Sequence, residues 1–211
     1  MGLFSGSSGR TAFGPLPPAP HPIGVNGFYT QHTNELALRI RERKTAFSGD
    51  DFAVKDAANG QTIFQVNGKV MSLSGKKDVR DAQGVDLFTI RKKHMAIRKT
   101  YKGDDAKTGQ EIFKVESSVF VMGTKLKITF KNTAGRGEDL TLTLRGDLFD
   151  RKAEITLDSG QPIARISREF ANAGQIFFDK QTYVLTIAPG VDASLLLAIC
   201  VCLDEAANDQ G

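Results

Sequence analysis

The side chains best suited to acid–base or metal chemistry are few and scattered in this sequence. Its three histidines are His21, His32 and His94. None has the spacing of a zinc motif such as His-Glu-x-x-His, and none accompanies a serine or cysteine nucleophile in a recognisable pattern. Acidic pairs at 50–51 and 104–105 stand beside turn residues, where solvated carboxylates are common. The sequence therefore predicts no catalytic residues, and we expect a non-enzymatic protein.

The two cysteines, Cys200 and Cys202, are the remaining candidates for metal or redox chemistry. On a helix this spacing turns the two side chains about 200° apart, so they cannot pair with each other. No further cysteine completes a thiolate site. We predict buried packing residues, no metal and no cofactor. Without a signal peptide or glycosylation sequon, we expect an intracellular protein, cytoplasmic, peripheral at a membrane or nuclear.

A basic stretch, "RKKHMAIRKTYKG" at 91–103, is the strongest candidate for binding. The chain has a mild formal excess of +4, and clustered bases attract lipid phosphates by about 1 kcal/mol each near a membrane. The alternative is a solvated strand face whose lysines keep β-edges apart. The predicted headgroup-binding residues are Arg91, Lys92, Lys93, Arg98, Lys99, Lys102, Lys125 and Lys127.

The segments that must position these bases are patterned as β-strands. "ELALRIRERK" alternates Leu36, Leu38 and Ile40 with charged residues, and "KLKITFK" at 125–131 alternates in the same way. A motif of Asp, small residues, Gly and then apolar-x-apolar recurs at 56–66, 81–90, 105–115 and 158–166. Asp and a glycine with positive φ are typical of hairpin turns. Roughly a dozen antiparallel strands are predicted, and so long a sheet should close into a barrel.

An apolar run from Ala193 to Leu203 ends the predicted domain. Its 11 residues are too few to span a bilayer, which takes about 20. Pro189-Gly190 breaks the preceding strand and Asp192 is a good N-cap, so the run predicts a helix over about 192–206. Because a helix that is apolar all round has no solvent face, it must be enclosed by protein. The fold class predicted is mainly β, a closed antiparallel barrel around a central hydrophobic C-terminal helix.

The hairpin segments "FAVKDAANGQTIFQVNGK" and "LSGKKDVRDAQGVDLFTIRKK", with the ending "IAPGVDASLLLAICVCLDEAAND", resemble the LURP-one-related family. That family belongs to the tubby C-terminal-like superfamily, with phospholipid scramblases as distant relatives. The resemblance implies a closed barrel around a hydrophobic C-terminal helix. We expect a disordered Gly/Ser/Pro-rich tail over 1–22 and one tubby-like barrel domain over 23–209.

Three functions are compatible with these features. The first is a non-enzymatic module that binds phosphoinositides or anionic membrane surfaces as a signalling or defence adaptor, and the resemblance to tubby-type domains favours it. The second is a nucleic-acid or transcription-linked factor, but Tyr101 is the one stacking residue among the bases. The third is scramblase-like lipid handling, which requires the apolar helix to reach lipid. No transmembrane span is predicted, and the oligomeric state is left open.

Overall fold

The computed structural model describes residues 14–45, 49–68, 76–93, 99–120, 123–147, 152–167, 169–170, 175–176 and 182–208. A short 3-10 helix, η1 (Gly27–Thr30), precedes the strands, and the helix α1 (Ala193–Asn208) ends this part of the chain. The strands are β1 (Leu36–Thr45), β2 (Gly49–Asp56), β3 (Thr62–Gly68), β4 (Lys77–Asp81), β5 (Asp86–Lys93), β6 (Thr100–Asp105), β7 (Glu111–Phe120), β8 (Gly123–Lys131), β9 (Asp139–Asp147), β10 (Lys152–Leu157), β11 (Pro162–Ser167), β12 (Glu169–Phe170), β13 (Gln175–Ile176) and β14 (Thr182–Ile187).

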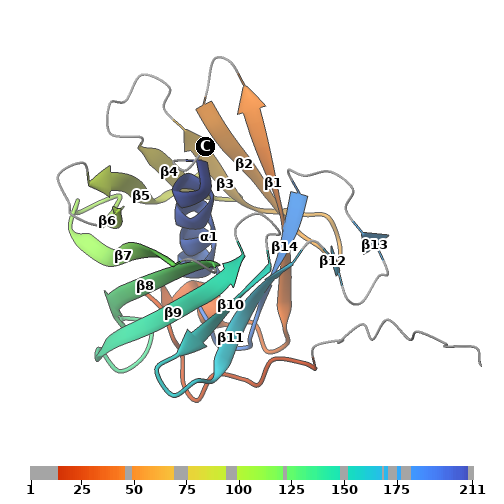
Figure 1. Cartoon of the computed structure of the whole chain (residues 1–211), viewed down its shortest axis with the longest axis vertical. Helices are drawn as coiled ribbons and strands as arrows, with labels where there is room; N and C mark the ends of the chain where they lie inside the picture. Colours follow the sequence, from red (N-terminus) through yellow and green to blue (C-terminus); the bar gives the residue numbers. More distant parts are fainter. Residues whose placement is uncertain are drawn as a thin grey trace, which may run out of the picture.

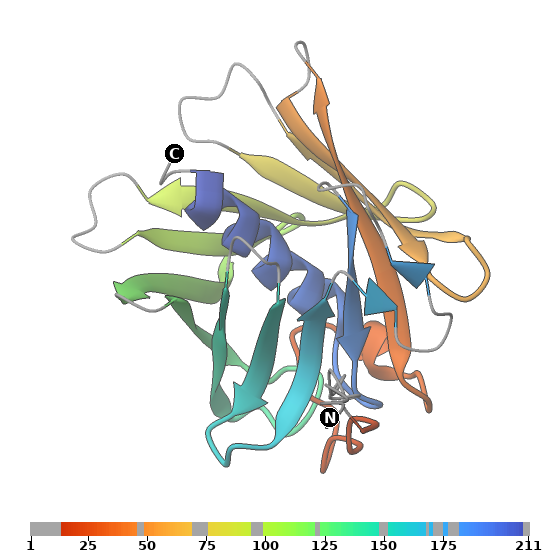
Figure 2. The same ribbon diagram turned by 45° about the vertical axis from the view of Figure 1, so that its right-hand side comes forward.

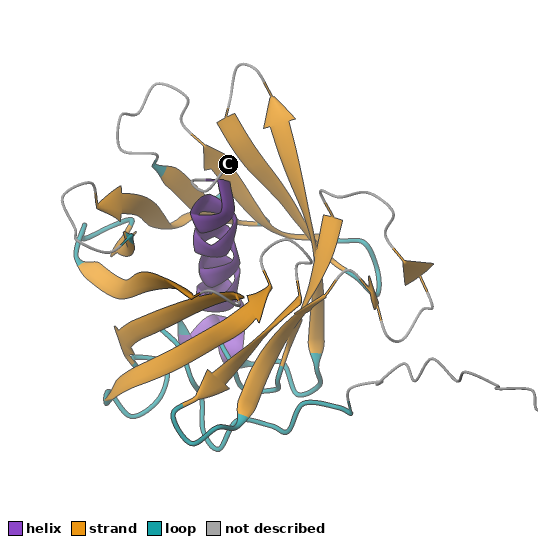
Figure 3. Ribbon diagram, in the orientation of Figure 1, coloured by secondary structure: helices purple, strands orange, loops and turns teal. Residues whose placement is uncertain are grey.

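The strands close into an antiparallel barrel in the order β1-β14-β11-β10-β9-β8-β7-β6-β5-β4-β3-β2 (Figures 1 and 3). Neighbouring strands are mostly consecutive in sequence because hairpins join them. The closure is between β1 and β14, where Leu36 pairs with Ile187 and Ile40 with Tyr183. The small sheet β12-β13 lies outside this barrel. The predicted closed barrel of about twelve antiparallel strands is confirmed.

The recurring Asp…Gly motifs form the hairpin turns at one end of the barrel. In the first of them, Asp56 accepts a hydrogen bond from the Ala58 N–H at 2.7 Å, and Gly60 has φ of +75°. The equivalent glycines, Gly84, Gly109 and Gly160, also have positive φ. An L side chain is strained in this conformation, so the repeated glycine is what allows each tight turn.

Helix α1 runs through the middle of the barrel (Figure 2). Every residue from Ala193 to Asp204 is buried. The inward residues of the wall, such as Phe64, Val115 and Leu144, are fully buried against it. No helix of the described ranges has the length and apolar character that crossing a bilayer demands. The apolar run is therefore the centre of the core, as its lack of a polar face predicted.

Asp192 caps the first turn of α1 from a fully buried position. Its Oδ1 accepts from the backbone N–H groups of Ser194 at 2.9 Å and Leu195 at 3.2 Å. Its Oδ2 accepts from the N–H groups of Val25 at 3.0 Å and Asn26 at 2.7 Å. One carboxylate thus ties the start of the helix to the segment that precedes β1, and the predicted N-cap is confirmed.

The structure differs from the sequence-based expectation at residues 14–22, which belong to the predicted disordered tail. Leu16 is buried and its N–H donates to Glu35 at 2.6 Å. The Gly14 carbonyl accepts from Arg165 Nη1 at 2.6 Å, and Ala19 N–H donates to the Pro189 carbonyl at 2.9 Å. This segment has no hydrophobic period, so only long-range contacts could reveal its order. The remainder of the tail, residues 1–13, lies outside the described residues.

Candidate functional site

The predicted basic residues lie on neighbouring strands of the wall. Arg91, Lys92 and Lys93 end β5, Lys102 lies in β6, and Lys125 and Lys127 lie in β8. Lys99 precedes β6, and its carbonyl accepts from the Ser117 N–H at 2.8 Å. Arg98 lies outside the described residues. The fold therefore gathers residues from distant parts of the chain onto one side of the barrel.

These residues do not share one face, because successive strand residues point to opposite sides of the sheet. In β5 the buried Phe88 and Ile90 point inward, so Lys92 shares their inner face while Arg91 and Lys93 point outward. In β6 the buried Tyr101 points inward, which puts Lys102 on the outer face.

Lys99 precedes the inward Tyr101 by two residues and so lies on the inner face as well, opposite the buried Ser117. In β8, Lys125 and Lys127 alternate with buried Leu126 and Ile128 and point outward. The predicted patch is thus divided between an outer face and the interior end of the barrel. We call the outward bases of β5–β9 the outer basic face. They are Arg91, Lys93, Lys102, Lys114, Lys125, Lys127, Lys131 and Arg145.

Acidic neighbours neutralise part of the outer basic face. Arg91 Nε lies 2.5 Å from Asp104 Oδ2, and Lys114 Nζ lies 2.8 Å from Glu116 Oε1. Lys102 forms an ion pair with Glu111. The first and third of these pairs join neighbouring strands, and the second lies within β7. On these strands the bases stand directly opposite one another in register, Arg91 beside Lys102 and Lys102 beside Lys114. Since like charges in register destabilise a sheet, the acids have a structural role here.

A second part of the outer basic face keeps its positive charge. Lys93, Lys127 and Arg145 are exposed, and within the described part of the chain none of the three has an ion-pair partner. Arg145 of β9 stands directly opposite Lys125 of β8. Sequence reasoning missed Arg145 as a site residue, although the alternation in "DLTLTLR" already placed it opposite to the buried leucines.

Inside the barrel, Lys77 and Tyr183 contact the acidic residues at the end of α1. Lys77 is 5% exposed, and its Nζ lies 2.6 Å from Glu205 Oε1 and 4.8 Å from the centre of the Phe52 ring. The Tyr183 hydroxyl donates to Asp204 Oδ2 at 2.8 Å. The last turn of α1 has no basic residue of its own. A helix C-terminus carries partial negative charge. The ammonium group of Lys77 therefore offsets both this partial charge and the carboxylate of Glu205.

Comparison with known proteins relates the barrel to one family. The model of the LURP-one-related family matches residues 36–204, which is most of the barrel and of α1. The chain belongs to the LURP-one-related family. The resemblance drawn from the hairpin motifs is therefore confirmed at the level of the family.

The curated LURP-one-related relatives are distant but match over most of their length. The protein named LURP-one-related 5 of Arabidopsis thaliana is 24% identical over 186 residues, covering 85% of this chain and 87% of the relative. Protein LURP1 of the same plant is 24% identical over 177 residues, covering 82% and 84%. An X-ray structure of an Arabidopsis thaliana protein has a TM-score of 0.60 at 19% identity, covering 87% of this chain and 97% of the other. This likeness concerns the fold alone.

Two further features of this LURP-one-related barrel bear on the alternative functions. Tyr101, the aromatic side chain among the basic residues, is 1% exposed and points into the barrel. Its ring therefore offers no exposed face on which a nucleobase could stack. Cys200 and Cys202 are buried free thiols, and burial raises the pKa of Cys202. Among the described residues, no three His, Cys, Asp or Glu side chains come together as metal ligands.

Proposed function

We propose that this LURP-one-related protein is a non-enzymatic module that binds anionic membrane surfaces through its outer basic face and acts as a signalling or defence adaptor. The observation that carries the proposal is the exposed charge of Lys93, Lys127 and Arg145, which have no ion-pair partner among the described residues. Each such base near an anionic bilayer contributes about 1 kcal/mol, and three together supply an affinity that responds to salt. Phosphoinositides, which carry several phosphate charges on one headgroup, are the lipids expected to bind best.

Flotation with lipid vesicles tests the proposal. We expect the protein to float with vesicles of phosphatidylcholine containing phosphatidylserine or a phosphoinositide at low salt. It should be released at roughly 0.5 M salt, where the Debye length falls to about 4 Å, and should not float with pure phosphatidylcholine. Absence of flotation with anionic vesicles at low salt would rule out the proposal.

Nucleic acid is the competing source of phosphates for the same charges. Proteins that bind single-stranded nucleic acid combine a basic groove with several exposed aromatic side chains. Tyr101, the aromatic residue among the basic residues 91–103, is buried. A filter-binding titration with single-stranded DNA and RNA separates the two partners. Retention of nucleic acid without vesicle binding would favour the transcription-linked alternative.

A further inference from the structure

The segment 14–22, which precedes β1 and runs along the outside of the barrel, is rich in proline (Figure 1). Proline fixes its own φ at about −65° and pushes the residue before it toward extended backbone. Each residue from Gly14 to Ala19 either is a proline or stands directly before one. This part of the segment therefore favours the polyproline II helix, which has three residues per turn.

Two residues that are three positions apart, Leu16 and Ala19, fasten this segment to the barrel. Leu16 is 3% exposed, and its N–H donates to the Glu35 carboxylate at 2.6 Å. Ala19 packs against the core, and its N–H donates to the Pro189 carbonyl at 2.9 Å. Because a polyproline II helix repeats every three residues, Leu16 and Ala19 lie on the same edge of it. This edge faces the barrel.

The other two edges of the helix are exposed. Pro15 and Pro18 lie on one of them, Gly14 and Pro17 lie on the other, and all four residues are exposed. We call these four residues the proline ridge. A binding groove contacts two adjacent edges of such a helix, with the prolines of a Pro-x-x-Pro motif on one of them. The barrel thus covers the edge that a groove would leave free.

A second Pro-x-x-Pro motif, formed by Pro17 and Pro20, is not equivalent to the first. Its recognised edges would include the edge of Leu16 and Ala19, which lies against the barrel. The backbone also bends at Pro20 and His21, where the straight part of the segment ends. The sequence therefore contains two overlapping motifs, and the fold leaves one of them accessible.

Contacts from the barrel hold the proline ridge in place. Arg165 Nη1 donates to the Gly14 carbonyl at 2.6 Å, and Gln161 Nε2 donates to the Pro18 carbonyl at 3.0 Å. Arg165 belongs to β11, and Gln161 stands directly before this strand. A segment that is already ordered loses little conformational entropy when a partner binds it. The ridge is therefore better prepared for binding than a free proline-rich tail.

The surroundings of the proline ridge are acidic. Glu35 is exposed beside Leu16, and Asp158 is exposed in the turn that supplies Gln161. The nearest cation, Arg165, has its Nε 3.2 Å from the carboxylate of Glu154, which offsets its charge. Since complementary charges favour association and like charges oppose it, a partner with a basic rim fits this surface better than one with an acidic rim.

We propose that the proline ridge is a docking site for a protein domain that binds polyproline II segments in an aromatic groove with a basic rim. SH3, WW and EVH1 domains bind Pro-x-x-Pro segments in this way, through aromatic side chains. The ridge contacts β11 and the residues before α1, whereas the outer basic face lies on β5–β9. The inference thus goes beyond membrane binding and does not depend on it.

Tryptophan fluorescence of the partner's groove tests the proposal, because this chain contains no tryptophan. The probe is a WW domain that has lysine or arginine at the rim of its groove, and adding the full-length chain should change its fluorescence in a saturable manner. Pro15→Ala/Pro18→Ala should weaken binding by about tenfold or more, because it removes both prolines of the accessible motif. Pro20→Ala/Pro22→Ala, which removes two prolines outside the ridge, should bind within about twofold of the wild type.

Absence of a saturable change with the WW domain, or equal weakening by the two double variants, would overturn the inference. An SH3 domain with an acidic rim is the second probe, and tighter binding of this domain than of the WW domain would overturn the assignment of a basic partner. Vesicle flotation of the same variants is an independent readout. Because neither variant changes the outer basic face, failure of one proposal leaves the other standing.

Discussion

At the scale of single residues, Asp192 has more structural consequences than any of the bases. Its carboxylate is completely buried and accepts four backbone hydrogen bonds and one from the Ser194 hydroxyl at 2.6 Å. These donors belong to α1 and to the segment before β1. Gly24, next to them, has φ of +150°, and a Cβ there would lie 2.0 Å from the Asp192 Cβ. A side chain larger than glycine at position 24 would therefore clash with Asp192 at the start of the helix.

Asp192→Asn is expected to lower the free energy of unfolding by about 2–4 kcal/mol, because the amide NH2 of asparagine would face buried N–H donors. Urea unfolding followed by circular dichroism measures the change. Asp158→Asn, in an exposed turn, is the matched control and should change stability by less than about 1 kcal/mol. Equal effects of the two substitutions would contradict this account of the cap.

Glu138 makes folding sensitive to acid. Hydrogen bonds from Asn132 and from the backbone, together with His21, lower its pKa from 4.5 to about 2. Because the unfolded chain then binds the proton more readily, the stabilising contribution is complete above pH 4.5 and is lost as the pH falls toward 2. The loss of stability between these pH values should be smaller in Glu138→Gln. An unchanged slope in urea-unfolding experiments across this range would show that Glu138 does not contribute.

At the scale of secondary-structure elements, the strands and hairpin turns could be predicted from the sequence because they depend on local residue patterns. The Asp…Gly turns and the alternation in "KLKITFK" and "ELALRIRERK" define strands without knowledge of their partners. The division of Arg91, Lys92, Lys93 and Lys99 between two faces was not predicted, because a run of charged residues hides the period of two. The burial of Lys77 was also missed, since its partner Glu205 lies 128 residues later. Contacts of this kind follow from closure of the barrel.

Leu196→Lys tests whether α1 is the core or a segment that reaches lipid. Leu196 is fully buried, and a lysine at this depth cannot extend its ammonium to water. We expect a loss of about 4 kcal/mol or more, enough to unfold a domain of ordinary stability. Val85→Lys at an exposed position should be nearly neutral. A Leu196→Lys variant that melts like the wild type would favour the scramblase-like alternative.

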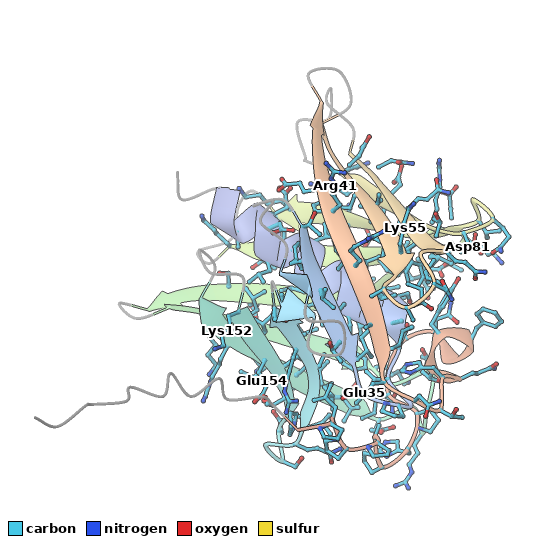
Figure 4. The ribbon with its side chains drawn as sticks, turned by 90° about the vertical axis from the view of Figure 1, so that its right-hand side faces the viewer. Glu35, Arg41, Lys55, Asp81, Lys152 and Glu154 are labelled. Carbon is cyan, nitrogen blue, oxygen red and sulfur yellow. The ribbon has the colours of Figure 1, made fainter. Side chains whose placement is uncertain are left out.

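At the scale of the whole molecule, the closed barrel presents charged side chains on several sides. Figure 4 shows a side away from β5–β8, on which Lys55 of β2 and Glu154 of β10 project outward. Here the Glu154 carboxylate is 3.2 Å from Arg165 Nε, so this side also mixes the two signs. The net attraction toward an anionic surface therefore depends on where unpaired bases stand, and the formal charge of +4 does not reveal their position.

Binding of matched charge-reversal variants to phosphatidylserine-containing vesicles tests the central claim most directly. Lys93→Glu/Lys127→Glu/Arg145→Glu alters the outer basic face. Lys55→Glu/Lys107→Glu/Arg136→Glu, in or beside the hairpin turns at 56–61, 105–110 and 132–139, changes the net charge by the same amount. At about 1 kcal/mol or more for each reversal, the first variant should bind roughly a hundredfold more weakly than the wild type, and the second should bind within a few-fold of it. Equal weakening of both would show that total charge, not the outer basic face, governs binding.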